Sequence, residues 1–156
     1  MYDGMEWTYM AKPLVVQVEI GIDAPASKVW SVLVKPEYIK QWDEVPDDFT
    51  EASLQLGTEM VWHLEHDEYT KLTVTAFDPE KMLRTSLYVS AWEEAGELNE
   101  DDIGYTYTLT ELDGGTLLNI SIGDFAKLAS EGQPYYEATI GFAQEAAHTI
   151  KQLAEQ

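Results

Sequence analysis

The sequence predicts an α+β fold in which a curved antiparallel β-sheet wraps around a long C-terminal helix. Residues 14–22 place apolar side chains at every second position, which is typical of a strand with one buried face. Residues 58–123 contain further strand-like segments joined by short turns, which favours antiparallel pairing. Residues 134–153 carry apolar side chains three and four positions apart, which predicts a long amphipathic helix.

Two short helices are expected between the first strand and the rest of the sheet. Pro25 is tolerated in the first turn of a helix and marks the start of the first one. Pro36 interrupts that helix and begins a second, which ends near Trp42. The acidic stretch 43–48 is expected to be a solvated loop.

The strand-rich region is expected to form a meander. Its strands are predicted at residues 58–66, 69–77, 82–92, 103–111 and 116–123. Asp113-Gly114-Gly115 has the composition of a hairpin turn, and the acidic stretch 93–102 is expected to be a solvated loop. The helix at 134–153 is the element long enough to cover such a sheet, and its apolar stripe runs from Tyr135 through Ala138 and Phe142 to Leu153.

The length of 156 residues fits one domain, which we place at residues 13–156, with residues 1–12 as an N-terminal tail or edge segment. A 45% apolar and 12% aromatic composition is enough for one hydrophobic core. The N-terminus lacks the pattern of a signal peptide and no stretch is long enough to span a membrane, so the expected location is the cytoplasm.

The charge is strongly negative, with 29 acidic residues against 9 basic ones and a net charge of −20. Such a chain repels phosphates, which argues against nucleic-acid partners and against anionic membrane surfaces. The acidity fits either a role in solubility or a docking face for a basic partner. The acidic residues are spread along the chain, which favours the first interpretation.

Several segments together resemble the START-like (SRPBCC) helix-grip superfamily, in the branch related to the activator of heat-shock-protein-90 ATPase. The resembling segments are Ala24-Pro25-Ala26-Ser27-Lys28-Val29-Trp30, Lys35-Pro36-Glu37-Tyr38-Ile39-Lys40-Gln41-Trp42, Asp78-Pro79-Glu80-Lys81-Met82-Leu83 and Gly115-Thr116-Leu117-Leu118. The resemblance covers roughly residues 13–155. This chain has Gly141-Phe142 where the family commonly has Gly-Trp.

The resemblance implies a helix-grip fold with a cavity between the sheet and the C-terminal helix. Relatives use this cavity for lipids, polyketides, sterols and other apolar or aromatic molecules. Some relatives are cyclases or hydratases, some are carriers, and some contact a chaperone. Because one fold serves all of these roles, the resemblance does not choose among them.

Histidines and acidic residues are the first candidates for catalysis or metal binding. His63 and His66 are three positions apart in a predicted strand, so they are expected to face opposite sides and cannot share a metal ion. Strand parity places His66 on the concave side near the strand end. The chain contains no metal-ligand motif, phosphate loop or nucleophile elbow, and no cysteine. We therefore predict no catalytic residue, metal or cofactor.

Inward-facing aromatic residues favour a ligand cavity. Tyr105 and Tyr107 share the inward parity, and a buried tyrosine hydroxyl without a partner costs about 1–3 kcal/mol. A cavity with a partly polar ligand or water would supply partners, whereas a closed core would have to supply them from the backbone. Thr85 is expected to point inward and Arg84 outward. The candidate cavity residues are Trp42, Trp62, His66, Thr85, Leu87, Tyr105, Tyr107, Tyr135 and Phe142.

The function expected from these observations is binding of a small hydrophobic or aromatic molecule, without catalysis. A cyclase- or hydratase-like enzyme acting on such a ligand is the first alternative. A co-chaperone-like interaction domain is the second, with a chaperone or a second copy of the chain as its partner.

Overall fold

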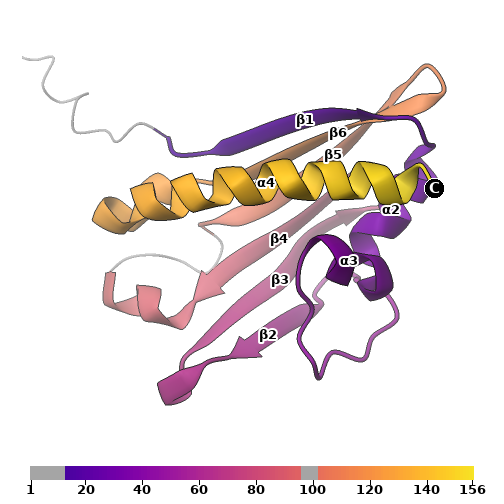
Figure 1. The fold of residues 1–156 in the computed structure, drawn as a ribbon. Helices are drawn as coiled ribbons and strands as arrows, with labels where there is room; N and C mark the ends of the chain where they lie inside the picture. Colours follow the sequence, from indigo (N-terminus) through magenta and orange to yellow (C-terminus); the bar gives the residue numbers. More distant parts are fainter. Residues whose placement is uncertain (1–12, 96–101) are drawn as a thin grey trace, which may run out of the picture.

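The computed structural model describes residues 13–95 and 102–156 (Figure 1). The predictions for the tail 1–12 and for most of the loop 93–102 lie outside this range. The elements are β1 (Val16–Ile22), α2 (Ala26–Val34), α3 (Pro36–Trp42), β2 (Glu59–His63), the 3₁₀ turn η1 (Glu65–Asp67), β3 (Tyr69–Asp78), β4 (Met82–Val89), η2 (Ser90–Ala95), β5 (Gly104–Leu112), β6 (Gly115–Gly123), η3 (Phe125–Glu131) and α4 (Gly132–Ala154).

The strands form one antiparallel sheet in the order β1-β6-β5-β4-β3-β2, which confirms the predicted meander. The first strand, whose place the sequence left open, pairs with β6. Side chains that pair across the sheet share a face. One such row runs Val16, Ile122, Tyr105, Thr85, Val74 and crosses five strands. This row lies on the concave face, which holds most of the core. The α+β helix-grip architecture predicted from the sequence is therefore confirmed.

The two short helices are joined at Lys35, where the backbone is extended. Pro36 is the first residue of α3, a position where a missing N–H costs nothing in that helix. Both helices bury their apolar faces. In the loop that follows α3, the Leu54 side chain packs into the core. The backbone N–H of Leu54 donates to the Val34 carbonyl at 2.8 Å.

Helix α4 lies along the half of the sheet formed by β1, β6 and β5, while β4, β3 and β2 extend beyond it (Figure 1). Its buried side consists largely of alanines, which allow the helix to approach β1 closely. These buried residues are Gly132, Ala143, Ala146, Ala147, Ile150, Leu153 and Ala154. The predicted apolar stripe is wrong in its first turns, because Tyr135 and Ala138 are exposed there.

Polar contacts fix the C-terminal end of α4 to the end of β1. The Lys151 ammonium donates to the Gly21 carbonyl at 2.9 Å, and the Asp23 N–H donates to the Glu155 carboxylate at 2.7 Å. Within the described residues, no helix combines the length and the apolar composition needed to cross a bilayer.

Two predicted strands are too long. Strand β2 ends at His63, because His66 and Asp67 adopt positive φ angles of 60° and 62° and reverse the chain. Strand β4 ends at Val89, where the Ser90 hydroxyl accepts the Tyr69 N–H at 2.9 Å and the η2 turn begins.

Candidate functional site

A pocket of about 320 Å³ lies between the end of α3 and the middle of α4. We call it the α3–α4 pocket. It is lined by Gln41, Trp42, Asp43, Glu44, Phe142, Glu145, Ala146 and Thr149. Its volume is near the lower end of the range usual for small-molecule sites.

Two aromatic pairs connect the pocket wall to strand β5. The Trp42 ring packs edge to face on Tyr107, with ring centroids 5.7 Å apart. The Phe142 ring packs edge to face on Tyr105, with centroids 6.1 Å apart. The two tyrosines are two positions apart on one strand, so both point to the concave face, as predicted. The pocket wall and the concave face are thereby part of one aromatic surface.

Asp43 is the acidic residue of this site that the core partly buries. Its N–H closes α3 by donating to the Ile39 carbonyl at 2.7 Å, and its side chain is half-buried at the pocket wall. Burial raises its pKa from 3.8 to about 6, while a hydrogen bond from the Glu44 backbone opposes the rise. In the part of the chain that the structure describes, Asp43 makes no ion pair.

The prediction of a fully solvated acidic loop at 43–48 is therefore wrong for Asp43, although Glu44, Asp47 and Asp48 are exposed. The sequence carried one signal that could have identified this residue. Asp43 directly follows a helix whose last residue is a large apolar tryptophan, so its side chain begins at the edge of the core.

The tyrosine hydroxyls lie close to this carboxylate. Burial raises the pKa of Tyr105 and of Tyr107, and the charge of Asp43 raises both further. Tyr107 is only 4% exposed. Neither hydroxyl forms a hydrogen bond with any described residue. Both tyrosines stay protonated at neutral pH and can each donate one hydrogen bond to a ligand or to Asp43.

Other predicted cavity residues lie on the concave face further from α4. Thr85 is buried beside Tyr105, while Leu87 and Trp62 are half-buried on β4 and β2. Arg84 lies on the opposite, convex face, as predicted. Its guanidinium donates to the hydroxyls of Thr75 and Ser86 at 3.0 and 2.8 Å.

Tyr135 belongs to a second aromatic group at the other end of α4. Its ring stacks on Phe125 at 6.2 Å and meets Trp92 edge to face at 5.4 Å. The indole N–H of Trp92 is fully enclosed without a hydrogen-bond partner, which is the one such atom among the described side chains. The sequence analysis missed Trp92, because η2 is not recognisable from its strand-like surroundings.

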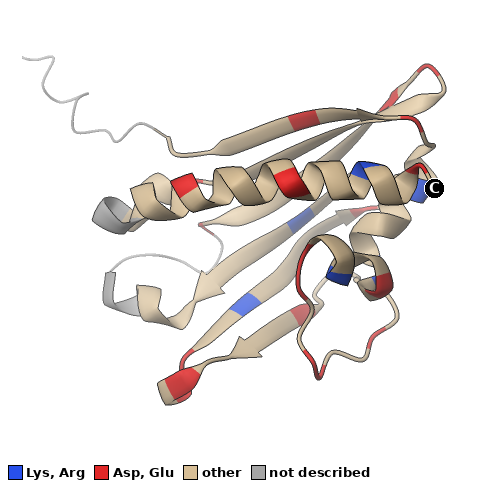
Figure 2. Ribbon diagram, in the orientation of Figure 1, with Lys and Arg blue, Asp and Glu red and all other residues tan. Residues whose placement is uncertain are grey.

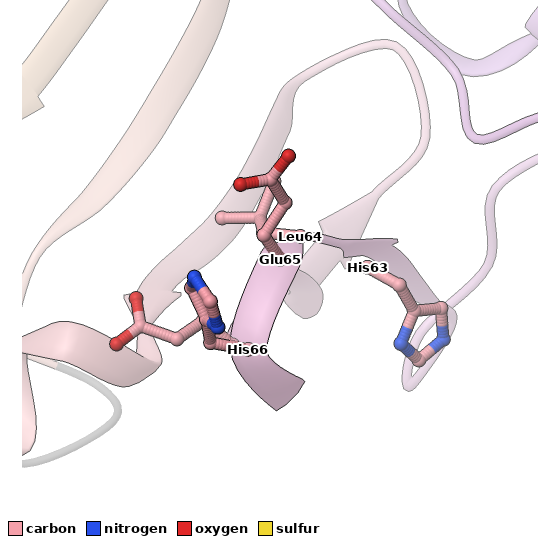
Figure 3. Close-up of a pocket in the computed structure, with 5 residues that line it drawn as sticks. His63, Leu64, Glu65 and His66 are labelled. Atoms are coloured by element: carbon pink, nitrogen blue, oxygen red, sulfur yellow. The ribbon is translucent and has the colours of Figure 1, made fainter.

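His66 does not lie on the concave face, which corrects the prediction. It is exposed in the η1 turn, because β2 ends three residues earlier. The residues of this turn line a shallow surface hollow. Figure 3 shows the side chains of His63 and His66 pointing to opposite sides of the turn. Across residues 13–95 and 102–156, no three histidine or acidic side chains gather as a metal site.

Comparison with protein families identifies the relatives of this fold. The family described as "Activator of Hsp90 ATPase homolog 1-like protein" matches residues 23–155. The chain belongs to this family. The match spans the segments on which the predicted resemblance rests, from the start of α2 to the end of α4. The α3–α4 pocket and its two aromatic pairs all lie within the Hsp90-activator-like region.

Solved structures support the same fold for this member of the Activator of Hsp90 ATPase homolog 1-like family. Protein MLL2253 from Mesorhizobium loti is 22% identical, with a TM-score of 0.68 over 89% of this chain and 95% of that chain. The Aha1 dimer from Colwellia psychrerythraea is 15% identical, with a TM-score of 0.66 over 90% and 96%. The Polyketide_cyc-like protein Cgl2372 from Corynebacterium glutamicum is 18% identical, with a TM-score of 0.60 over 94% of each chain. No curated protein matches the sequence significantly.

Proposed function

We propose that this protein binds a small hydrophobic or aromatic molecule in the α3–α4 pocket and along the adjoining concave face. The observation that carries the proposal is the pair of inward tyrosines with hydroxyls that no described residue satisfies. Tyr107 is only 4% exposed as a residue, but its hydroxyl is not among the fully enclosed atoms without a partner, so it remains accessible to water or to a ligand. A partly polar ligand can exchange a hydrogen bond with such a hydroxyl.

The aromatic lining supports the same proposal. Trp42 and Phe142 flank the pocket, and the side chains of Trp62, Leu87 and Tyr105 stay half-buried on the concave face. Ligand sites combine apolar walls with a few oriented polar groups, and this site has both.

The experiment is a titration with N-phenyl-1-naphthylamine, a neutral aromatic probe that becomes fluorescent in apolar sites. The wild-type protein should bind the probe saturably. Thr149→Trp places a bulky ring at the pocket wall and should abolish most of the binding. A wild-type protein that leaves the probe dark would contradict the proposal.

The control is His148→Trp, which introduces the same ring one residue away. His148 is exposed on α4 and does not line the pocket. This variant should bind the probe as the wild type does. If both variants lose probe binding equally, the added tryptophan disturbs the helix. If both variants keep probe binding, the probe binds outside the α3–α4 pocket, which contradicts the proposal.

The second candidate is an enzyme of the cyclase or hydratase class, and the titratable Asp43 favours it. A carboxyl group with a pKa near 6 beside two protonated tyrosines could exchange protons with a bound molecule. The test is native mass spectrometry of gently purified protein, followed by incubation of any released compound with fresh protein. Recovery of the compound unchanged favours binding alone.

The family also makes an interaction role a candidate for this chain. The test is pull-down with a chaperone ATPase, together with its turnover rate and the oligomeric state of this protein. A complex that changes turnover would support this role, and a monomer without effect on turnover would count against it.

A further inference from the structure

We propose that the ligand of the α3–α4 pocket carries a positively charged amine, held between the Asp43 carboxylate and the surrounding aromatic rings. This inference rests on the proposed function and specifies the class of molecule that the pocket takes. A hydrophobic or aromatic ammonium compound combines the apolar body and the positive charge that the lining residues match.

The first argument is the unpaired charge of Asp43. This carboxylate lines the pocket and is half-buried, yet no lysine, arginine or histidine is among the residues that line it. Burying a carboxylate without a cation is unfavourable, and proteins usually pair such a group. A ligand ammonium is the partner that the pocket lacks.

The second argument is the arrangement of the rings. Trp42 and Phe142 line the pocket together with Asp43, and their inner neighbours are Tyr107 and Tyr105. Aromatic faces attract cations through their quadrupole, and tryptophan and tyrosine attract them most strongly. Aromatic rings beside an acidic group favour an amine over a neutral or anionic molecule.

The third argument concerns the oxygen atoms around the pocket. Tyr107 packs behind the pocket wall against Trp42, and its hydroxyl lies near Asp43 without a described hydrogen-bond partner. Its oxygen can accept a hydrogen bond from an ammonium group while its proton points to the carboxylate. The Asp43 carboxylate is the acceptor at the pocket, and the nearby hydroxyl is a second acceptor for a ligand that reaches past the wall.

The electrostatic field of the protein works in the same direction. Glu44 and Glu145 line the pocket beside Asp43. Figure 2 shows acidic residues on α3, α4 and the loop after α3, and the net charge of the chain is −20. This field raises the local concentration of cations and lowers that of anions.

The test uses three compounds that share one ring system and differ in charge: 2-naphthylmethylamine, 2-naphthylmethanol and 2-naphthoate. Their dissociation constants are measured by calorimetry at pH 7.5. The ammonium compound should bind the wild type about tenfold more tightly than the alcohol, and the carboxylate should bind most weakly. The preference should persist at raised salt concentration, because partly buried charges are screened less than surface charges.

The decisive variant is Asp43→Asn, with Asp47→Asn as its control. Asp47 is exposed in the same loop and does not line the pocket. The first variant should lose most of the preference for the amine over the alcohol, because the carboxylate that pairs the ammonium is gone, and the second should keep the wild-type preference. Calorimetry of the folded variants is preceded by circular dichroism, so that misfolding is detected separately.

Three results would overturn the inference. If the alcohol binds the wild type as tightly as the amine, the pocket is a hydrophobic site without charge recognition, and the proposed function stands alone. If Asp43→Asn keeps the preference, the selectivity comes from the general surface field. If none of the three compounds binds while the protein is folded, both this inference and the proposed function are overturned.

Discussion

The indole N–H of Trp42 donates a hydrogen bond to the main-chain carbonyl of Val32 at 2.9 Å. In an uninterrupted helix this carbonyl would accept from the residue four positions later, which is Pro36 and has no N–H. The side chain that forms the pocket wall therefore also repairs the break between α2 and α3. Its position is fixed by the break itself.

This relationship predicts different outcomes for two buried tryptophans. We expect Trp42→Phe to lower the free energy of unfolding by about 2 kcal/mol, because the Val32 carbonyl is left unsatisfied in a buried site. Trp92→Phe removes a donor that has no partner, so it should cost clearly less. Urea unfolding of both variants measures the difference, and a larger loss for Trp92→Phe would contradict it.

Thr116 is expected to be a second sensitive polar position. It is completely buried, and its hydroxyl donates to the Ala24 carbonyl at 2.8 Å, joining β6 to the chain before α2. Thr116→Val keeps the shape and removes the donor, so it should cost about 1–2 kcal/mol of unfolding free energy. Thr116→Ser retains the hydroxyl and serves as the comparison in the same urea experiment. If valine proves as stable as serine, the hydrogen bond contributes little.

Most of the fold could be predicted because its elements carry strong local patterns. Each of three patterns indicates one kind of element. Alternating apolar residues indicate the strand β1, two prolines mark the starts of the short helices, and the apolar spacing near the C-terminus indicates the helix α4. The strand ends were predicted less well. His66 and Asp67 adopt positive φ angles although neither is glycine, so composition alone did not indicate the turn.

The site could be predicted only in part, because it depends on contacts between distant segments. The alternation of side chains along a strand was enough to predict that Tyr105 and Tyr107 point inward, because pairing with the neighbouring strands fixes which face each residue of β5 occupies. Asp43 was missed because an acidic run is usually solvated, and its burial arises from the packing of α3 against α4. Tyr135 was misjudged because α4 extends past the part of the sheet that it covers.

Phe142 tests whether the aromatic surface of the pocket matters for binding. We expect Phe142→Ala to weaken binding of N-phenyl-1-naphthylamine and to lower the unfolding free energy by about 2 kcal/mol, less than for a fully buried ring. Probe titration and urea unfolding measure the two effects. His148→Ala, on the exposed side of the same helix, should change neither. Undiminished probe affinity in Phe142→Ala would show that the ring has no part in binding.

Asp43 gives the protein a specific pH dependence of stability. Its pKa is raised from 3.8 to about 6 in the folded state, so between these values the folded protein holds more protons than the unfolded one. Stability therefore falls as pH rises through this window, and the ionised group costs up to about 3 kcal/mol at neutral pH. Asp43→Asn removes this cost while its amide oxygen can still accept the Glu44 N–H.

We expect Asp43→Asn to be more stable than the wild type at pH 7.5, with an advantage that shrinks by about 1 kcal/mol at pH 5. The groups that face Asp43 do not reverse this sign. Glu44 and Glu145 are like-charged, and Tyr105 and Tyr107 remain protonated throughout. Urea unfolding of both proteins at the two pH values, with Asp47→Asn as the exposed control, measures the change. An advantage that is the same at both pH values would place the Asp43 pKa near that of a solvated aspartate. A protein that keeps so costly a carboxylate ionised at neutral pH is more stable without it, so the group is expected to serve binding rather than folding.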